Sequence, residues 1–381
     1  MFYAPTHYYT QHSIDRMGPF AANQQRDAQD VEELMTSARA ASSASVFESF
    51  VTEMRDARKP LSAILEQENV MITASRLVRV FVPAIAIIAL GFFVVGAQAQ
   101  QRGAAPDYSS MVEQTTQLAP NLYRFEAVGP VLVGNAAALV GPDGVFLVDA
   151  QTPQMTDKYV AAIKAVSNGA PMRFLVNTHQ HPDHTGGNAN MAAMGVVLLA
   201  RDELRTRLSA GNNPPPPASL SVITYNGQGR TAIHMNGEDI QLIPVLNAHT
   251  DGDTVVHFPK ADVIMVGDFY RSIQYPNFDR NNGGSVKGAI AAINQVIAMA
   301  KPTTKIVPGH GPVVDKTALT ANIDLINTIQ TRVAALIAQG KTQEEVIAAK
   351  PLADLDARVK EVGTTGDRFL GQVYAELKTG K

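Results

Sequence analysis

Short apolar runs alternate with segments of helical periodicity between residues 118 and 340 of this chain. Short runs of apolar or β-branched side chains, bounded by Gly, Pro, Asn or Asp, predict strands. The predicted strands are residues 121–127, 131–140, 145–150, 173–178, 196–200, 231–235, 239–245, 254–259, 262–268 and 305–309. Apolar positions spaced three and four apart predict helices. The predicted helices are residues 155–167, a short one near 188, 201–210, 285–300 and 317–338.

Turn signals separate several of these elements. Gly141-Pro142-Asp143-Gly144 predicts a turn between two strands, and Asn236-Gly237 predicts a hairpin. Four consecutive prolines exclude both helix and strand from residues 211–220. Each half of the segment carries several strands together with helices. This organisation predicts an α+β fold in which two sheets pack face to face, with helices on the outside.

The N-terminal region has a different pattern. Residues 80–97, VFVPAIAIIALGFFVVGA, form the one long uncharged apolar run of the chain. Arg76 and Arg79 precede the run, and Ala97-Gln98-Ala99 ends it. A basic flank, an apolar core and an A-x-A end are typical of a secretory signal peptide. We therefore expect residues 71–99 to direct a periplasmic or secreted protein.

Residues 1–70 leave two interpretations open, because a signal peptide does not normally follow a long segment. In the first, Met71 is the true start, and residues 1–70 are a misassigned start or a disordered extension. In the second, residues 80–97 are an uncleaved inner-membrane anchor and provide the protein's one contact with a membrane. At 18 residues this run is near the lower limit for crossing a bilayer core of about 30 Å.

Composition narrows the chemistry. A hydrophobic fraction of 45% with 18% charged residues is compatible with a globular core. A net charge of -3 gives no basis for a nucleic-acid partner. The chain has no cysteine, which excludes a disulfide framework, a thiolate ligand and a Cys nucleophile. Any metal ion must therefore be bound by nitrogen and oxygen. No G-x-S-x-G motif supplies a serine nucleophile.

The stretch FLVNTHQHPDHTGG, residues 174–187, concentrates candidate ligands directly after an apolar run. It contains three of the 9 histidines of the chain, His179, His181 and His184, together with Asp183. Imidazole nitrogen and carboxylate oxygen are common zinc ligands. Side chains alternate along a strand, so His-x-His presents both rings on one side. One segment can therefore offer two ligands to one ion and two ligands to a neighbouring ion.

Three later residues have ligand side chains in the same context, directly after a β-like run. They are His249 in NAHTDGD, Asp268 in VGDFY and His310 in VPGHGPV. We expect one edge of the sheets to gather all of them. Other His and Asp residues are assigned roles that do not involve a metal ion. These are His234 and His257 at the surface, and Asp251 and Asp253 as turn or capping groups.

This pattern resembles the metallo-β-lactamase superfamily over roughly residues 118–338. The resemblance rests on His-x-His-x-Asp-His in THQHPDHTGG, followed by His249, by Asp268 in Gly-Asp, and by His310 in Gly-His-Gly. It implies the αββα sandwich of that family, two packed mixed sheets flanked by helices, with the site at one edge. Residues 118–340 would be the catalytic domain and residues 341–381 a C-terminal helical tail.

The resemblance also implies a ligand set for two Zn²⁺ ions, with iron or manganese as alternatives. The first ion would be bound by His179, His181 and His249, the second by Asp183, His184 and His310, and Asp268 would bridge them. This seven-ligand set is similar to that of the glyoxalase II type. The β-lactamase subclass with a cysteine ligand is excluded. The all-histidine subclass usually lacks the bridging aspartate, so Asp268 argues against a β-lactamase proper.

The implied chemistry is an exported hydrolase in which a hydroxide between two metal ions attacks a carbonyl group. The substrate would be a small ester, thioester, lactone or β-lactam, and Asp183 would orient the hydroxide or move its proton. The loop 269–284 supplies the candidate substrate contacts Tyr270, Arg271, Tyr275 and Asn277. The alternatives are a β-lactamase, an iron-dependent oxidoreductase similar to persulfide dioxygenases, and a non-catalytic relative.

Overall fold

A computed structural model describes residues 106–380 of the chain, apart from residues 211–213, 228 and 362. These residues belong to one compact unit, Ala104–Lys381. The predicted signal peptide or anchor at residues 71–99 and the segment 1–70 lie outside the described residues. Among the residues that the structure describes, no helix is long and apolar enough to cross a membrane.

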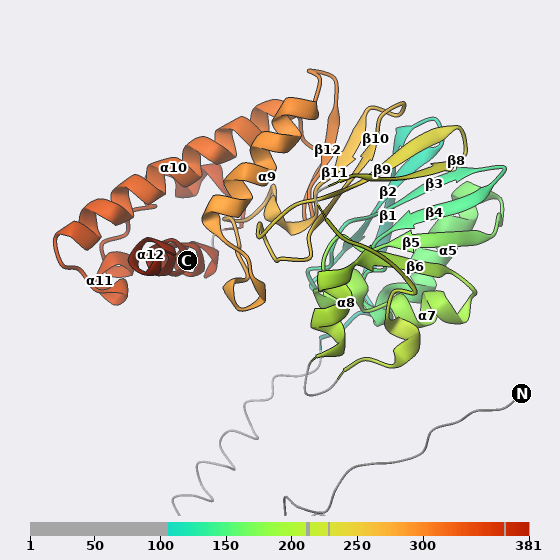
Figure 1. Ribbon diagram of the computed structural model, residues 1–381, viewed down its shortest axis with the longest axis horizontal. Helices are drawn as coiled ribbons and strands as arrows, with labels where there is room; N and C mark the ends of the chain where they lie inside the picture. The colour runs from blue at the N-terminus through green and yellow to red at the C-terminus, as the bar shows by residue number, and fades with distance from the viewer. Residues whose placement is uncertain (1–105, 211–213, 228, 362, 381) are drawn as a thin grey trace, which may run out of the picture. The chain divides into compact units, whose positions relative to one another are not determined.

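Two mixed sheets form the centre of the fold (Figure 1). The first has the spatial order β1-β2-β3-β4-β5-β6-β7, antiparallel from β1 to β4 and parallel from β4 to β7. The strands are β1 (Val112–Ala119), β2 (Leu122–Val128), β3 (Ala136–Gly141), β4 (Gly144–Val148), β5 (Met172–Val176), β6 (Val197–Arg201) and β7 (Ile223–Tyr225).

The second sheet has the order β12-β11-β10-β9-β8, in which only the pair β11 and β12 is parallel. The strands are β8 (Thr231–Met235), β9 (Glu238–Pro244), β10 (Thr254–Phe258), β11 (Val263–Met265) and β12 (Lys305–Val307). Asn236 and Gly237 turn the chain between β8 and β9, and both have positive φ, 54° and 75°. Two residues of positive φ match the right-handed twist of a hairpin, so the predicted hairpin is confirmed.

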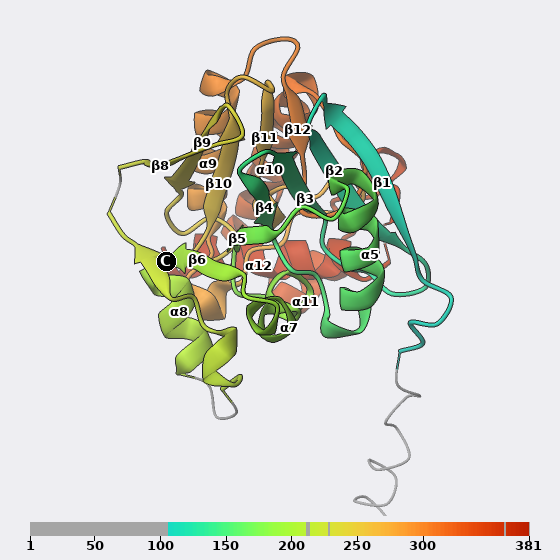
Figure 2. The same ribbon diagram turned by 90° about the vertical axis from the view of Figure 1, so that its right-hand side faces the viewer.

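Helices cover the outer faces of both sheets (Figures 1 and 2). The α-helices are α5 (Thr156–Ser167), α6 (Pro182–Thr185), α7 (Asn188–Ala193), α8 (Asp202–Ser209), α9 (Val286–Met299), α10 (Lys316–Ala338), α11 (Gln343–Ala348) and α12 (Thr365–Thr379). Short 3₁₀ turns are η1 (Pro153–Met155), η2 (Pro217–Ser219), η3 (Gly267–Phe269), η4 (Arg280–Asn282) and η5 (Asp356–Arg358).

Three apolar clusters correspond to the three interfaces of this layered fold. Between the sheets, Phe146 of β4 and Phe258 of β10 belong to one buried cluster. Outside the first sheet, Tyr159 and Ile163 of α5 pack on its other face. Outside the second sheet, the third cluster unites α9 and α10 with α11 and α12. Burying each large apolar side chain contributes about 1.5–3 kcal/mol. The predicted α+β sandwich of two packed mixed sheets flanked by helices is confirmed.

Several predicted boundaries differ from the structure. The predicted strand 131–140 begins only at Ala136. The predicted strand 262–268 ends at Met265, and η3 begins two residues after it. Strand β1 was not predicted, because most of its side chains are exposed and it lacks apolar alternation. The segment predicted as a helical tail, residues 341–381, contains α11 and α12, which share their apolar cluster with the second sheet.

Candidate metal centre

The seven candidate ligands lie together at one edge of the two sheets. The loop after β5 carries His179 and His181, and the short helix α6 carries Asp183 and His184. His249 follows β9, Asp268 lies in η3 after β11, and His310 follows β12. Their ligand atoms form two groups that both contain Asp268. One group is His179, His181, His249 and Asp268, and the other is Asp183, His184, Asp268 and His310.

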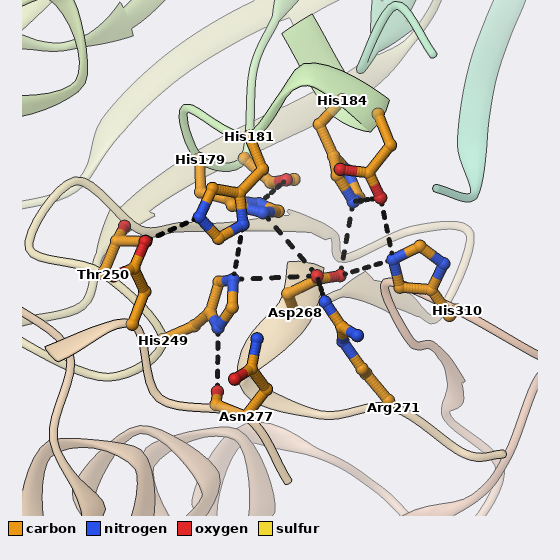
Figure 3. A network of polar contacts seen from close by, with 12 residues as sticks. His179, His181, His184, His249, Thr250, Asp268, Arg271, Asn277 and His310 are labelled. Carbon is orange, nitrogen blue, oxygen red and sulfur yellow. Dashed lines mark hydrogen bonds and ion pairs between the residues drawn. The ribbon is translucent and has the colours of Figure 1, made fainter. Parts of the chain in front are cut away.

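Asp268 lies between the two groups and turns one carboxylate oxygen to each (Figure 3). Its Oδ2 is 3.7 Å from Nε2 of His179 and 3.6 Å from Nε2 of His249. Its Oδ1 is 3.3 Å from Nε2 of His184 and 3.3 Å from Nε2 of His310. Asp183 closes the second group, with Oδ2 3.1 Å from Nε2 of His310. The carboxylate of Asp268 is therefore placed to be shared by two cations.

These spacings fit a metal ion. Zinc bonds of about 2.0–2.2 Å in tetrahedral geometry place neighbouring ligand atoms about 3.4 Å apart. The closer distances between ligand atoms run from 3.0 Å, between Nε2 of His249 and Nδ1 of His181, to 3.7 Å, and all ligand atoms of a group lie within 4.8 Å of one another. Nε2 of His179, His184 and His310 and Oδ1 of Asp268 are buried and have no hydrogen-bond partner among the described residues. Buried polar atoms without partners are costly, and one cation in each of the two ligand groups would satisfy all of them.

Other residues fix the ring nitrogens that face away from the centre. Nδ1 of His184 is 2.8 Å from Oδ2 of Asp149, whose Oδ1 accepts from the backbone N–H of Thr178. Nε2 of His181 is 2.7 Å from Oδ2 of Asp279. Contacts of this kind set the tautomer and the orientation of a ligand ring.

The remaining two outer contacts come from one hydroxyl and one carbonyl. Oγ1 of Thr178 lies 3.2 Å from Nδ1 of His179. The carbonyl oxygen of Asn277 lies 2.8 Å from Nδ1 of His249 (Figure 3). A carbonyl oxygen can only accept, so Nδ1 of His249 carries the hydrogen and its Nε2 presents a lone pair to the site.

Histidines of the two ligand groups have opposite pKa shifts. Burial lowers the pKa of His249 to about 3 and also lowers the pKa of His179 well below its usual value. Burial acts in the same direction on His184, but the carboxylates of Asp183 and Asp268 outweigh it and raise the pKa of His184 well above its usual value. A proton on His184 neutralises part of the charge of these carboxylates, as a bound cation would. A metal ion would therefore displace that proton on binding.

The candidate substrate contacts have different environments in the structure. Arg271 pairs with Oδ2 of Asp268 beside the metal centre. Tyr270 and Tyr275 are buried in the apolar cluster of α9 to α12, and the hydroxyl of Tyr275 donates to Asp356. Asn277 contacts His249 through its backbone. Burial gives the side chain of Tyr275 a packing role, whereas Arg271 keeps its place next to the ligands.

The His and Asp residues predicted to be surface, turn or capping groups lie outside the ligand set. His234 is exposed, with 73% of its side chain accessible, and His257 is half-buried. Asp253 is a turn group, because its Oδ2 accepts from the backbone N–H of His249 and of Thr250. Asp251 pairs instead with Arg207 of α8.

Sequence reasoning missed Asp149, Asp279 and the role of the Asn277 carbonyl. Asp149 had a signal, since it follows the apolar run of β4 at the same sheet edge as the ligands. Its positive φ of 62° also marks a specialised backbone position. Asp279 had no such signal, because it lies in an irregular loop.

Together, the two packed sheets and the paired His and Asp groups at their edge define an α+β protein whose site supports metal binding. The family model described as the Metallo-beta-lactamase superfamily matches residues 129–310, which include all seven side chains. Residues 129–310 therefore match the metallo-β-lactamase superfamily, as the sequence pattern predicted.

Individual relatives match parts of the chain. The 2,4-dinitroanisole O-demethylase subunit alpha of Nocardioides sp. (strain JS1661) is 28% identical over 151 residues, 37% of this chain and 44% of that protein. A hydroxyacylglutathione hydrolase of Erythrobacter litoralis (strain HTCC2594) is 29% identical over 136 residues, 35% of this chain and 43% of that protein. The chain thus spans less than half the length of these two relatives. A solved metallo-beta-lactamase from Pontibacter korlensis aligns with a TM-score of 0.49 and 20% identity, over 56% of this chain and 99% of that structure.

Proposed function

We propose that this protein is a hydrolase that uses two zinc ions to cleave a carbonyl compound: an ester, a thioester, a lactone or a β-lactam. The observation that carries the proposal is the carboxylate of Asp268, which faces one group of ligands with each oxygen. A single zinc ion takes about four ligands. Seven side chains in two groups around one shared carboxylate therefore fit two ions.

Each ion would have three ligands of its own besides Asp268. The first would be bound by His179, His181 and His249, and the second by Asp183, His184 and His310. Nitrogen and oxygen ligands without sulfur suit zinc. Bound there, the ions would polarise a carbonyl group and lower the pKa of a water from about 15.7 to near 7.

The exposed ligands define the open side of the site. The side chains of His181 and Asp183 are 22% and 25% accessible, whereas those of His184, His249 and His310 are fully buried. Burial opposes ionisation of Asp183, but the nearby His184 and His310 hold the pKa of Asp183 well below its usual value. Asp183 is therefore a carboxylate at neutral pH. It can accept a hydrogen bond or a proton from a water on the open side, which is the catalytic role that we assign to it.

The space beside the ligand loop suits a small-molecule substrate. A cavity of about 990 Å³ is lined by Gln180 and Pro182, which alternate with the ligands, and by the prolines 214–217 and Leu208. Ligand pockets typically enclose about 300–1,000 Å³. None of the seven ligands lines this cavity, but Pro182 lies between His181 and Asp183 in the chain, so we propose that substrate approaches from this side. The proline and leucine walls of the cavity favour a substrate with an apolar group.

Two measurements on the purified protein test this function. Elemental analysis should find two zinc ions per chain, and a screen of chromogenic lactam, thioester, lactone and phosphodiester substrates should find turnover. Asp183→Ala and His181→Ala should each reduce turnover at least about 100-fold. His234→Ala replaces an exposed histidine away from the site and should leave turnover unchanged.

The outcomes separate this function from its alternatives. Turnover that survives both ligand substitutions would refute the mechanism. One iron ion per chain would instead favour the oxidoreductase alternative. We also propose that residues 71–99 direct export, which cell fractionation of the tagged full-length chain tests. Recovery of the protein in the cytosol alone would contradict it.

A further inference from the structure

The segment from Asn277 to Asp279 contacts the outward-facing ring nitrogens of two histidines of the first ligand group, His249 and His181. The carbonyl oxygen of Asn277 accepts from Nδ1 of His249 at 2.8 Å, and Oδ2 of Asp279 lies 2.7 Å from Nε2 of His181. The backbone N–H of Asp279 also donates to the carbonyl of His249 at 2.8 Å. This short segment therefore sets the orientation of both rings, since each ring has its outer nitrogen fixed there.

The C-terminal helix α12 fixes that segment through one side chain. Oε1 of Gln372 accepts from the backbone N–H of Phe278 at 3.0 Å, and its Nε2 donates to Oδ1 of Asn277 at 2.9 Å. The ring of Phe369, one turn earlier in α12, contacts the ring of Phe278 with centroids 6.0 Å apart. Gln372 also lines a cavity of about 300 Å³ together with His181 and Asp279.

A second contact anchors α12 close to the same loop. The carboxylate of Glu376, one turn after Gln372, accepts from the backbone N–H groups of Val286 and Lys287 at 2.6 and 2.9 Å. These two residues begin α9, which follows the loop. Helix α12 therefore has a fixed position relative to the loop, and the amide of Gln372 transmits that position to residues 277–279.

We propose that Gln372 is a positioning residue for the first metal site. It touches neither a metal ion nor a substrate in this arrangement. Its amide holds the segment that presents Nε2 of His249 and Nδ1 of His181 to the ion. Loss of this amide should lower metal affinity at the first site and leave the second site unchanged. The second group takes its outer contact from Asp149 instead, on the first sheet.

Titration of metal-free protein with Zn²⁺ or Co²⁺ tests this inference without any substrate. Gln372→Met keeps the length of the side chain but loses both hydrogen bonds. We expect it to weaken one of two binding steps about 10-fold, the lower end of the effect of losing a direct outer contact to a ligand, because Gln372 acts through residues 277–279. Tyr374→Phe is the matched control, because it removes another hydrogen bond of α12, to the carbonyl of Lys341, away from the site.

A second background assigns the affected step. In His184→Ala, which lacks a second-site ligand, the remaining ion reports on the first site, and Gln372→Met should weaken it by the same factor. If Gln372→Met unfolds the protein, Gln372→Glu takes its place, because it keeps the acceptor for the Phe278 N–H and replaces the donor to Asn277 with a carboxylate oxygen. Wild-type affinity at both sites in a folded Gln372 variant overturns the proposal.

This inference rests on the metal-binding part of the proposed function, and the titration distinguishes the two. Wild-type protein that binds two ions but cleaves no substrate would refute the hydrolase and leave the role of Gln372 intact. Wild-type protein that binds no metal would overturn both. An equal loss in Gln372→Met and Tyr374→Phe would indicate a general effect on folding and refute a positioning role.

Discussion

Substitution of Gly134 by alanine should selectively disturb the second metal site. Gly134 precedes β3, and its backbone N–H donates to the carbonyl of Asp183 at 3.3 Å. A Cβ added there would meet the ring of His184, 2.5 Å from Nε2 and 2.8 Å from Nδ1, and closer still to Cε1. Gly134 does not have the left-handed backbone that disfavours alanine, so the steric clash is the one perturbation.

The expected size of the effect follows from this geometry. Ordinary contacts of a Cβ begin at 3.4 Å, so the ring or the loop must move by about 1 Å. The ring is fully buried, and Asp149 holds its Nδ1 at 2.8 Å. Metal sites require ligand positions within about 0.2–0.5 Å. We expect a 10- to 100-fold loss of affinity at the second site and a cost of about 1–3 kcal/mol from overpacking.

The assay is a metal titration of Gly134→Ala together with its thermal unfolding. One of two binding steps should weaken, and turnover should fall with occupancy of that step. Gly229→Ala is the control, because its added Cβ meets nothing within 4 Å and its backbone is not left-handed. Two binding steps of wild-type affinity with an unchanged unfolding midpoint would refute the reasoning, because the clash would then have been relieved without moving the ligand.

Three further predictions concern Asp149, Glu113 and the metal content of the site. Asp149→Asn should weaken second-site metal binding about 10- to 100-fold, because Asp149 orients His184; equal affinity in the two proteins would contradict this. Burial raises the pKa of Glu113 from 4.5 to about 7, so the stability provided by its neutral form is complete below about pH 4.5 and is lost as the pH rises through about 7. The free energy of unfolding of Glu113→Gln, relative to that of wild type, should therefore rise by up to about 3 kcal/mol between pH 5 and pH 8. Denaturant titrations that show the same difference between the two proteins at every pH would disprove this prediction. A chelator should lower the midpoint of thermal unfolding, because ions bind only the folded site, and added Zn²⁺ should restore it; an unchanged midpoint would count against metal binding.

The sequence predicted the ligand set, because the ligands lie in segments that follow predicted strands. A strand is recognisable from a few consecutive side chains, and the residue after it must emerge at a sheet edge. That rule led to His249, Asp268 and His310, and the structure brings them to the loop that begins at His179. The layered fold followed from the same local patterns, since apolar strands and amphipathic helices have few ways to bury their faces.

Elements without an inward-facing apolar pattern were missed for a related physical reason. Strand β1 lies at the edge of its sheet, and its polar side chains leave no alternation to detect. The strand predicted at 262–268 was too long, because its apolar residues continue into the η3 turn that carries Asp268. Burial alone does not distinguish a strand from a buried turn.

By itself, the sequence determined the ligand types, their order along the chain and the strands that position them. Only the tertiary structure decided which contacts orient those ligands. Asp279 and Gln372 lie 98 and 95 positions from the residues they contact, His181 and Asn277. Hydrogen bonds between such distant positions depend on how sheets and helices pack, and no local pattern of side chains encodes that packing.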